Sequence, residues 1–295
     1  MIYDIRLMIS YDYAGSAVNA RHMLCLGAAT LPGLQRVTSC DIEISPEPEE
    51  RQARLDFFGN RVEEFTCRAV HESIRIDLSA RVERVVQAKP SQDSIPLADL
   101  PNALHAWRDI GAASPLHHRA GSFRVPHNAS MTRFARAALK PGMNAREAVM
   151  AVCHALHDHM QFDPEATTVD TPVAEAFARR HGVCQDFSHV MIACLRGIGV
   201  PAGYVSGFLR TIPPPGKARL EGVDAMHAWV RAWCGPATGW EEFDPTNDCP
   251  AGPDHIVVAY GRDYSDVVPI KGILRVAGPQ NSAQSVDVVP VQELD

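Results

Sequence analysis

The chain has 295 residues, of which 46% are hydrophobic, so it is long enough to bury a substantial core in two domains. Its 28 basic and 35 acidic residues give a formal net charge of −7, which predicts no surface for nucleic acid or for an anionic membrane. No apolar run is long enough to cross a membrane, and the first residues lack the pattern of a secretory signal. Eight scattered cysteines are typical of reduced thiols, so we expect a cytoplasmic protein.

Residues 1–88 are expected to form an antiparallel, β-sandwich-like domain. Apolar and polar side chains alternate from Ile5 to Tyr11, from Cys40 to Ile44 and from Ile74 to Leu78, as they do in half-buried strands. Gly59 supplies a turn between two such stretches. The pattern therefore predicts a small β domain at the amino terminus.

Residues 89–129 are expected to connect this domain to a core at 130–295. The connecting segment is rich in Pro, Ser, His and Ala, with short helical pieces such as Leu97 to Trp107. In the core, helical periodicity is expected near 145–160, 171–181 and 184–197, and strand patterns from 202 to 276. This order predicts an α+β core in which helices pack on an antiparallel sheet.

Cys184 is the strongest candidate for a catalytic residue. It follows Gly182, which lets the backbone turn tightly, and it opens an apolar-periodic segment that predicts a helix from Cys184 to Gly197. The free amides and positive dipole end of a first helical turn favour thiolate over thiol. The amides of Cys184 and Gln185 are the expected donors to an oxyanion. Cys194, on the apolar face of the same helix, is expected to pack in the core.

A histidine and an aspartate follow downstream. His227 lies in an alternating stretch that predicts a strand with its ring on the same face as Trp229 and Trp233. A second strand from Trp240 leads into Asp244, which suits neighbouring strands of a hairpin. A cysteine, a histidine and an aspartate in this order indicate acyl transfer through a thioester.

Motifs run through nearly the whole chain. They are GVCQDFSH around Cys184, GVPAGYVSGFL at 199–209, DAMHAWV around His227, GWEEFDPTND around Asp244 and DHIVVAYGRDYSDVVPIKG at 254–272, with HMLCL near His22 and DFFGNRV near Gly59 before them. Together they resemble the bacterial transglutaminase-like family, whose core is related to the papain-like cysteine proteases. The resemblance implies a β-rich amino-terminal domain before a transglutaminase-like core.

The resemblance also implies a role for each member of the proposed triad. Cys184 is the expected nucleophile, His227 the base, and Asp244 the carboxylate that orients the imidazole. One departure is Gly203, where the family often has arginine. This puts a local ion pair or substrate contact in doubt, but not the triad.

Three further residues are candidates for contact with the substrate or the oxyanion. Gln185 and Asp186 follow the nucleophile directly, although Asp186 is also explained by its favourable place at the helix dipole. Trp229 is a candidate wall of the acyl-donor cleft near His227, although tryptophans more often belong to the core. His189 is expected to be a packing or hydrogen-bonding residue.

The run Cys153, His154, His157 and His159 raises the possibility of a metal site, because His154 and His157 are one helical turn apart. No second cluster at ligand spacing completes the coordination, so packing or solvated histidines are favoured. The chain also has no acidic loop with calcium-ligand spacing. We therefore expect no metal and no cofactor.

The expected partner is a protein or peptide whose amide carbonyl is attacked by the thiolate. If water resolves the thioester, the enzyme is a protease, peptidase or deamidase; if an amine does, it is a transglutaminase. Hydrolysis is favoured, because bacterial relatives with this architecture are often regarded as cysteine proteases. Two alternatives are a non-catalytic scaffold and thiol redox chemistry, but the latter requires a resolving cysteine close to Cys184. The sequence leaves the oligomeric state open.

Overall fold

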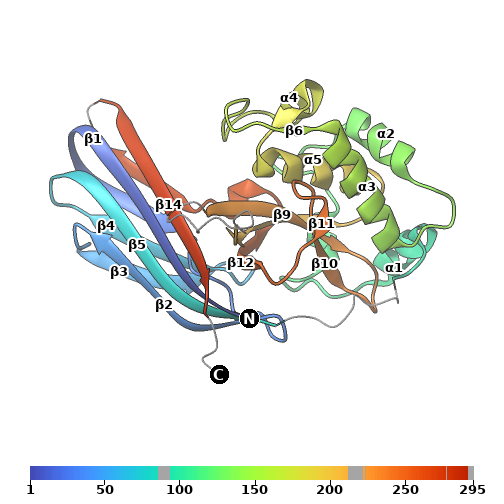
Figure 1. The fold of residues 1–295 in the computed structure, drawn as a ribbon, viewed down its shortest axis with the longest axis horizontal. Coiled ribbons are helices and arrows are strands. Elements are labelled where there is room, and N and C mark those ends of the chain that lie inside the picture. The colour runs from blue at the N-terminus through green and yellow to red at the C-terminus, as the bar shows by residue number, and fades with distance from the viewer. Residues whose placement is uncertain (86–93, 212–221, 223, 277, 292–295) are drawn as a thin grey trace, which may run out of the picture.

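The structure is a computed structural model that describes residues 1–85, 94–211, 222, 224–276 and 278–291. Parts of the expected connecting segment, of the strand region and of the carboxyl-terminal end lie outside these residues. A curled antiparallel sheet and a core of helices and strands lie side by side (Figure 1). No helix among the described residues is long and apolar enough to span a bilayer.

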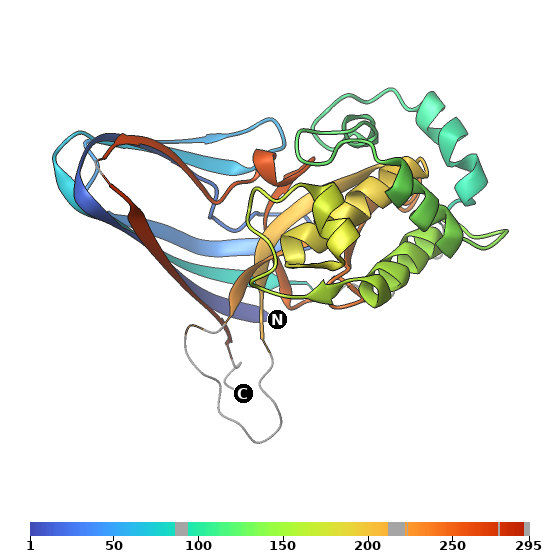
Figure 2. The ribbon, with the colours of Figure 1, turned by 90° about the horizontal axis from the view of Figure 1, so that it is seen from above.

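The curled sheet is built around one long strand. Its strands are β1 (Ile2–Leu24), β2 (Gln35–Ser45), β3 (Glu50–Leu55), β4 (Arg61–Cys67), β5 (His71–Arg84), β13 (Ile270–Arg275) and β14 (Gln280–Pro290). The first half of β1 pairs with β5 and β14, and its second half pairs with β4 and β13. The register shifts between these halves, where β1 bends, and the two halves of the sheet fold toward each other (Figure 2).

The expected alternation produces the core of this sheet. Ile5, Leu7 and Ile9 of β1 are buried, and Leu7 lies opposite Leu78 of β5. Burying each such side chain stabilises the fold by about 1.5–3 kcal/mol. Gly59, in the turn between β3 and β4, has φ +82°, a conformation that disfavours residues with a Cβ.

The last strands of the chain return to the amino-terminal sheet. β13 pairs with β1 from Val18 to Leu24, and β14 pairs with β1 from Tyr3 to Tyr13. The sequence pattern assigned this stretch to the catalytic core. The domain boundaries themselves stay a prediction, but residues 270–290 lie in the same sheet as β1.

The core consists of helices packed on a five-stranded sheet of order β11-β10-β9-β8-β12. Its strands are β8 (Ala202–Leu209), β9 (Ala225–Trp233), β10 (Trp240–Asp244), β11 (Cys249–Pro250) and β12 (His255–Gly261). Its α-helices are α1 (Leu100–Ala106), α2 (Ala129–Ala138), α3 (Ala145–His159), α4 (Val173–Arg179) and α5 (Cys184–Gly197). The short elements are η1 (Leu97–Asp99), η2 (Pro115–His118), η3 (Tyr264–Asp266) and the two-residue strands β6 (Gln161–Phe162) and β7 (His181–Gly182).

Helix α5 is the centre of this core. It contacts α2, α3, α4, β8 and β9, and its residues from Asp186 to Arg196 are all buried. A helix that is buried on all sides is held by its surroundings and not by propensity alone. The predicted α+β fold is confirmed, and the surrounding elements fix the start of α5 in space.

Candidate active site

Cys184 is the first residue of α5, and its side chain is half-buried against the core. Val183 before it is extended, with φ −102° and ψ 178°. The first amides of an α-helix have no carbonyl partner inside the helix. Within the part of the chain that the structure describes, no hydrogen bond reaches the amides of Cys184 and Gln185. Two free donors and the positive end of the helix dipole therefore lie beside the thiol.

The carboxylate of Asp186 caps the start of α5. Its Oδ2 accepts hydrogen bonds from the Val183 amide at 2.9 Å and the Thr167 hydroxyl at 2.6 Å, and burial raises the pKa of this carboxyl despite them. Only 2% of the residue is exposed, so the geometry favours a role at the helix start over contact with substrate. Gly182 serves the cap too: its φ is not positive, but a Cβ there would lie 2.6 Å from Asp186 Oδ2.

The structure brings His227 of β9 next to Asp244 at the end of β10. The Nε2 atom of His227 lies 2.7 Å from Oδ2 of Asp244, and the carboxylate is fully buried. Because Nε2 is bound to the carboxylate, Nδ1 is the ring nitrogen left for a second partner. The Cys184 thiol is near enough to the ring to help raise the pKa of His227, so Nδ1 is the nitrogen that we expect to face the sulfur.

The surroundings of His227 and Asp244 favour the protonated, imidazolium form of His227. Burial alone would lower the pKa of His227, but hydrogen bonds to Asp244 and Cys184 and the charges of both raise it to about 10. Burial likewise disfavours ionised Asp244, yet hydrogen bonds from His227 and His255 hold the pKa of this carboxyl well below its usual range. At neutral pH the His227 ring is therefore protonated, and it lies between the Asp244 carboxylate and the Cys184 sulfur.

Two residues that hold Asp244 were missed in the sequence. His255, at the start of β12, donates from Nε2 to Oδ2 of Asp244 at 3.0 Å, and Asn247 donates from Nδ2 to the same oxygen at 2.6 Å. The Nδ1 atom of His255 accepts from the Gly252 amide at 3.1 Å, so the proton of the neutral ring lies on Nε2. His255 was inside the DHIVVAYGRDY motif, but only the sheet arrangement shows that it reaches Asp244.

The other candidates have more limited contacts with the site. Trp229 is fully buried, stacks on His227 with ring centroids 6.0 Å apart, and donates to Glu242 at 2.8 Å, so its ring supports the histidine from inside the fold. The side chain of Gln185 is partly exposed and donates to the Val169 carbonyl at 3.2 Å.

Among the described residues, one group has donor atoms arranged as a metal site would need: His227, Asp244 and His255, within 4.8 Å of one another. Hydrogen bonds already account for this arrangement. Because Nε2 of His255 carries a proton, it has no lone pair to offer a metal in this state.

The histidines of α3 do not converge on a common point. His154 bonds to Asp248, whereas the ring of His159 lies against those of Phe134 and Phe177 at 4.8 and 5.0 Å. His189 is buried and accepts from the Tyr264 amide at 3.2 Å. These contacts are those of packing and hydrogen-bonding residues.

Comparison with known proteins identifies the family. Residues 132–245 match the transglutaminase-like superfamily, and residues 3–83 match the bacterial transglutaminase-like N-terminal region. An uncharacterised protein of Mycobacterium tuberculosis is 33% identical over 268 residues, which cover 88% of this chain and 83% of the relative. The chain belongs to the transglutaminase-like superfamily. An uncharacterised protein of Mycobacterium leprae is 32% identical over 246 residues, 82% of this transglutaminase-like chain and 81% of the relative.

A solved structure shares the fold of this transglutaminase-like protein. It is that of a candidate cysteine protease from Cytophaga hutchinsonii, with a TM-score of 0.74 and 18% sequence identity over 99% of this chain and 91% of the other. At this level of identity the likeness shows the fold alone. It covers both the curled sheet and the core.

The departure from the family pattern at Gly203 has a structural explanation in this transglutaminase-like protein. A Cβ at Gly203 would lie 2.8 Å from Nδ1 of His118, a fully buried residue of η2. Arg231, the partner of Gly203 across the β8–β9 ladder, donates to Nε2 of His118 at 2.9 Å. Its guanidinium also lies 4.6 Å from the Trp240 ring and 4.3 Å from the Tyr260 ring. A buried arginine is therefore present here, one strand away from the family position.

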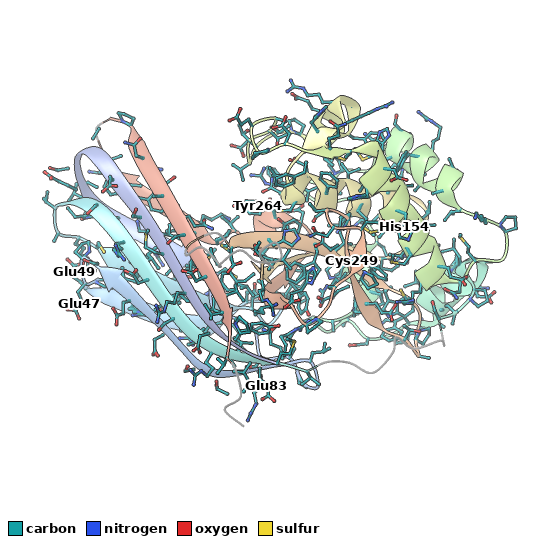
Figure 3. All side chains as sticks on the ribbon, viewed as in Figure 1. Glu47, Glu49, Glu83, His154, Cys249 and Tyr264 are labelled. Carbon is teal, nitrogen blue, oxygen red and sulfur yellow. The ribbon has the colours of Figure 1, made fainter. Side chains whose placement is uncertain are left out.

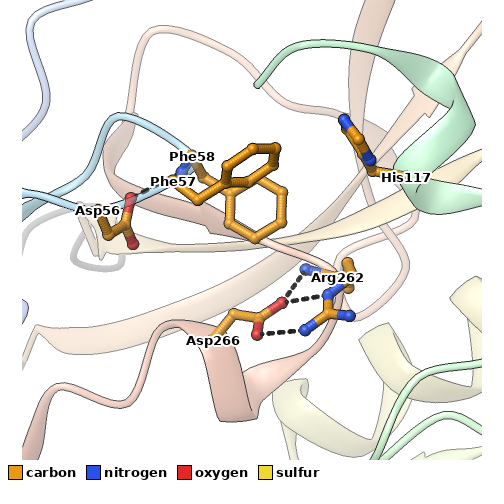
Figure 4. Close-up of a pocket in the computed structure, with 6 residues that line it drawn as sticks. All are labelled: Asp56, Phe57, Phe58, His117, Arg262 and Asp266. Carbon is orange, nitrogen blue, oxygen red and sulfur yellow. Dashed lines mark hydrogen bonds and ion pairs between the residues drawn. The ribbon is translucent and has the colours of Figure 1, made fainter. Parts of the chain in front are cut away.

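A hollow of about 440 Å³ lies apart from the proposed triad, where the β3–β4 turn meets η2 and the loop after β12 (Figure 4). It is lined by Asp56, Phe57, Phe58, His117, Arg262 and Asp266. The Arg262 guanidinium is already paired with Asp266, with both separations at 2.9 Å. None of the three triad residues lines this hollow in the transglutaminase-like protein.

Proposed function

We propose that this transglutaminase-like protein is a thiol-dependent enzyme that attacks peptide or glutamine amides through Cys184, His227 and Asp244, with water as the usual acceptor. The observation that carries the proposal is the His227 ring, bound through Nε2 to Asp244 at 2.7 Å and coupled to the Cys184 sulfur, with its pKa raised to about 10. A ring held in this way is suited to both proton transfers of acyl transfer.

In the proposed first half-reaction, the Cys184 thiolate attacks the carbonyl carbon of the amide. The amides of Cys184 and Gln185 donate to the oxyanion, because they have no partner among the described residues. The carbon–nitrogen bond then breaks, and the leaving amine takes the proton from His227. A thioester remains on Cys184.

In the second half-reaction, an acceptor attacks the thioester while His227 removes its proton. The oxyanion collapses and the Cys184 thiolate leaves, which restores the thiolate–imidazolium pair. Water gives hydrolysis, and a lysine or small amine gives a transglutaminase product; the same residues serve both. A scaffold function is less consistent with a buried carboxylate held by His227, His255 and Asn247, since binding a partner needs no such network. We also propose a cytoplasmic location, which suits eight free thiols.

The experiment is incubation of the whole protein with N,N-dimethylated β-casein, with and without methylamine, followed by mass spectrometry. We expect mainly cut or deamidated casein and little methylamine adduct from the wild-type protein. We expect no product from Cys184→Ala. A dominant methylamine adduct would assign the enzyme to crosslinking. Equal product from wild type and Cys184→Ala would refute the proposed function.

A further inference from the structure

The outer edge of β14 has backbone groups that point away from the sheet. The Ala14 amide donates to the Pro279 carbonyl at 3.0 Å, and the Val291 amide donates to the Ile2 carbonyl at 2.8 Å. In an antiparallel pair, residues that bond to the partner strand alternate with residues that point outward. The N–H and C=O groups of residues 281, 283, 285, 287 and 289 therefore bond to β1, and those of residues 282, 284, 286 and 288 face outward.

Part of this outward row already meets the catalytic core. Val286 forms a bridge with Asp224, and the Val288 amide donates to Oδ2 of Asp224 at 2.6 Å. Asp224 directly precedes β9, three residues before His227. For the next outward residues, Ser282 and Gln284, no backbone partner exists among the residues that the structure describes.

This stretch of edge differs from the other edges of the same sheet. Natural proteins protect sheet edges with charged residues, prolines or bulges, because a bare edge pairs with other chains. The edge strands β2 and β3 carry charged residues, and β13 carries Lys271 and Arg275. Residues 280–285, Gln-Asn-Ser-Ala-Gln-Ser, have no charge and no proline. Residues 280–285, called the bare stretch from here on, are therefore an unprotected part of the edge, and they lie beside the core.

A hollow of about 270 Å³ borders the bare stretch. It is lined by Ile9, Tyr11, Tyr264, Pro269, Ile270, Ser282, Ala283 and Gln284. Ala283 points to the opposite face of the strand from its two neighbours, so the hollow borders the strand backbone as well as its inner face. Tyr264, from η3 of the core, lies on the side of the core that faces β14 (Figure 3).

A relay of side-chain contacts links the wall of this hollow to Gln185, the residue after Cys184. The guanidinium of Arg124 lies 5.6 Å from the Tyr264 ring and donates to the Val169 carbonyl at 2.5 Å. The side chain of Gln185, next to Cys184, donates to the same carbonyl. Tyr264, in the wall of the hollow, is thus linked to Gln185 beside Cys184 through three successive contacts.

We propose that the edge of β14 at Ser282 and Gln284 binds an extended polypeptide, the acyl donor, by adding it to the sheet as a further strand. The outward N–H and C=O groups on alternate residues of β14 match those of another extended backbone, so this pairing is tolerant of the sequence of the bound chain. Tyr11 and Tyr264 of the hollow contact the side chains of the bound chain. The inference rests on the proposed function for the role of the bound chain, but binding itself does not require turnover.

The test uses the full chain with Cys184→Ala, so that nothing is consumed, and fluorescein-labelled N,N-dimethylated β-casein as an extended probe. Ser282→Pro combined with Gln284→Pro removes both outward amides without touching a bond to β1, and proline is tolerated at such edge positions. Ser282→Ala with Gln284→Ala is the matched control, which keeps the amides. Fluorescence anisotropy measures Kd, and thermal unfolding checks the fold of each variant.

We expect the proline pair to weaken binding on the order of tenfold and the alanine pair to change it by about twofold or less. Hydrogen exchange gives a second readout that needs no proline: casein is expected to slow the amides of residues 282 and 284. Unchanged exchange at both, equal Kd for both pairs, or no binding of casein overturns the proposal. If wild type processes casein without protecting these amides from exchange, the edge site is refuted and the proposed function stands. If casein binds at the edge but is never processed, the edge site stands and the proposed function is refuted.

Discussion

Asp244 is the residue on which the proposed site depends most at the scale of single side chains. Its Oδ2 receives His227, His255 and Asn247, and its Oδ1 receives the backbone amides of Thr246 and Asn247 at 2.9 and 3.2 Å. Hydrogen bonds from so many directions leave the carboxylate one orientation. That orientation fixes which nitrogen of His227 faces Cys184.

Asp244→Asn is expected to lower kcat by about 10³-fold or more with little change in KM, because the amide no longer holds the imidazole in its working tautomer. The measurement is steady-state hydrolysis of a small chromogenic ester. Asn247→Ala, which removes one donor and keeps the carboxylate, is expected to be far milder. Equal, small losses for both variants would contradict the role given to the carboxylate.

His255→Phe is expected to lower kcat by about tenfold or more at similar KM, since one hydrogen bond to a charged group is lost beside the base. It is also expected to change the pKa of His227, which can be followed by NMR titration of the imidazole. His255→Gln keeps a donor and is expected to recover part of both effects. A KM effect alone, with an unmoved His227 titration, would show that His255 only packs.

Among the elements, α5 shows what the sequence could and could not predict. Its apolar periodicity is local, so its bounds and the place of Cys184 at its start were predictable. The favourable place of Asp186 in the first turn is local too, since its carboxylate reaches the Val183 amide three residues back. The hydrogen bond from Thr167 was not predictable, because it depends on how the preceding loop folds back onto the helix start. The contact of His255 with Asp244 was not predictable either, since β12 reaches the site only through sheet pairing.

Gly182→Ala is expected to lower the free energy of unfolding by about 1–3 kcal/mol, because the new Cβ would overlap the Asp186 carboxylate that caps α5. Gly252→Ala is a matched control, since a Cβ at Gly252 meets nothing within 4 Å. Urea unfolding of both variants provides the measurement. A Gly182→Ala protein as stable as the control would contradict the account of the helix start.

At the scale of the whole molecule, the chain closes on itself. β13 and β14 carry the chain from the core back to the sheet that began with β1, so the two parts are joined at both ends. The alternation of apolar and polar residues predicted most of the strands, but it does not indicate which strand each of them pairs with. The return of residues 270–290 therefore lay beyond the sequence pattern.

Global stability is expected to depend on pH through the His227–Asp244 pair. The pKa of His227 is raised to about 10, so between about pH 6.5 and 10 the folded protein keeps a proton that the unfolded chain loses, and stability falls as pH rises. The pKa of Asp244 is lowered, so its contribution is present above about pH 4 and is lost in acid. Urea unfolding at about pH 6, 8 and 10 is expected to show a steeper fall for wild type than for His227→Gln. Parallel curves would contradict the coupling.

The central claim is that one of the eight cysteine thiols forms the covalent intermediate, and trapping that intermediate is the most direct test. The protein is mixed with p-nitrophenyl acetate, quenched in acid and mapped by peptide mass spectrometry. The account predicts a single acetyl group on Cys184 that forms far more slowly in His227→Ala and is absent in Cys184→Ala. An acetyl group on another cysteine at a comparable rate, or none on Cys184, would contradict it.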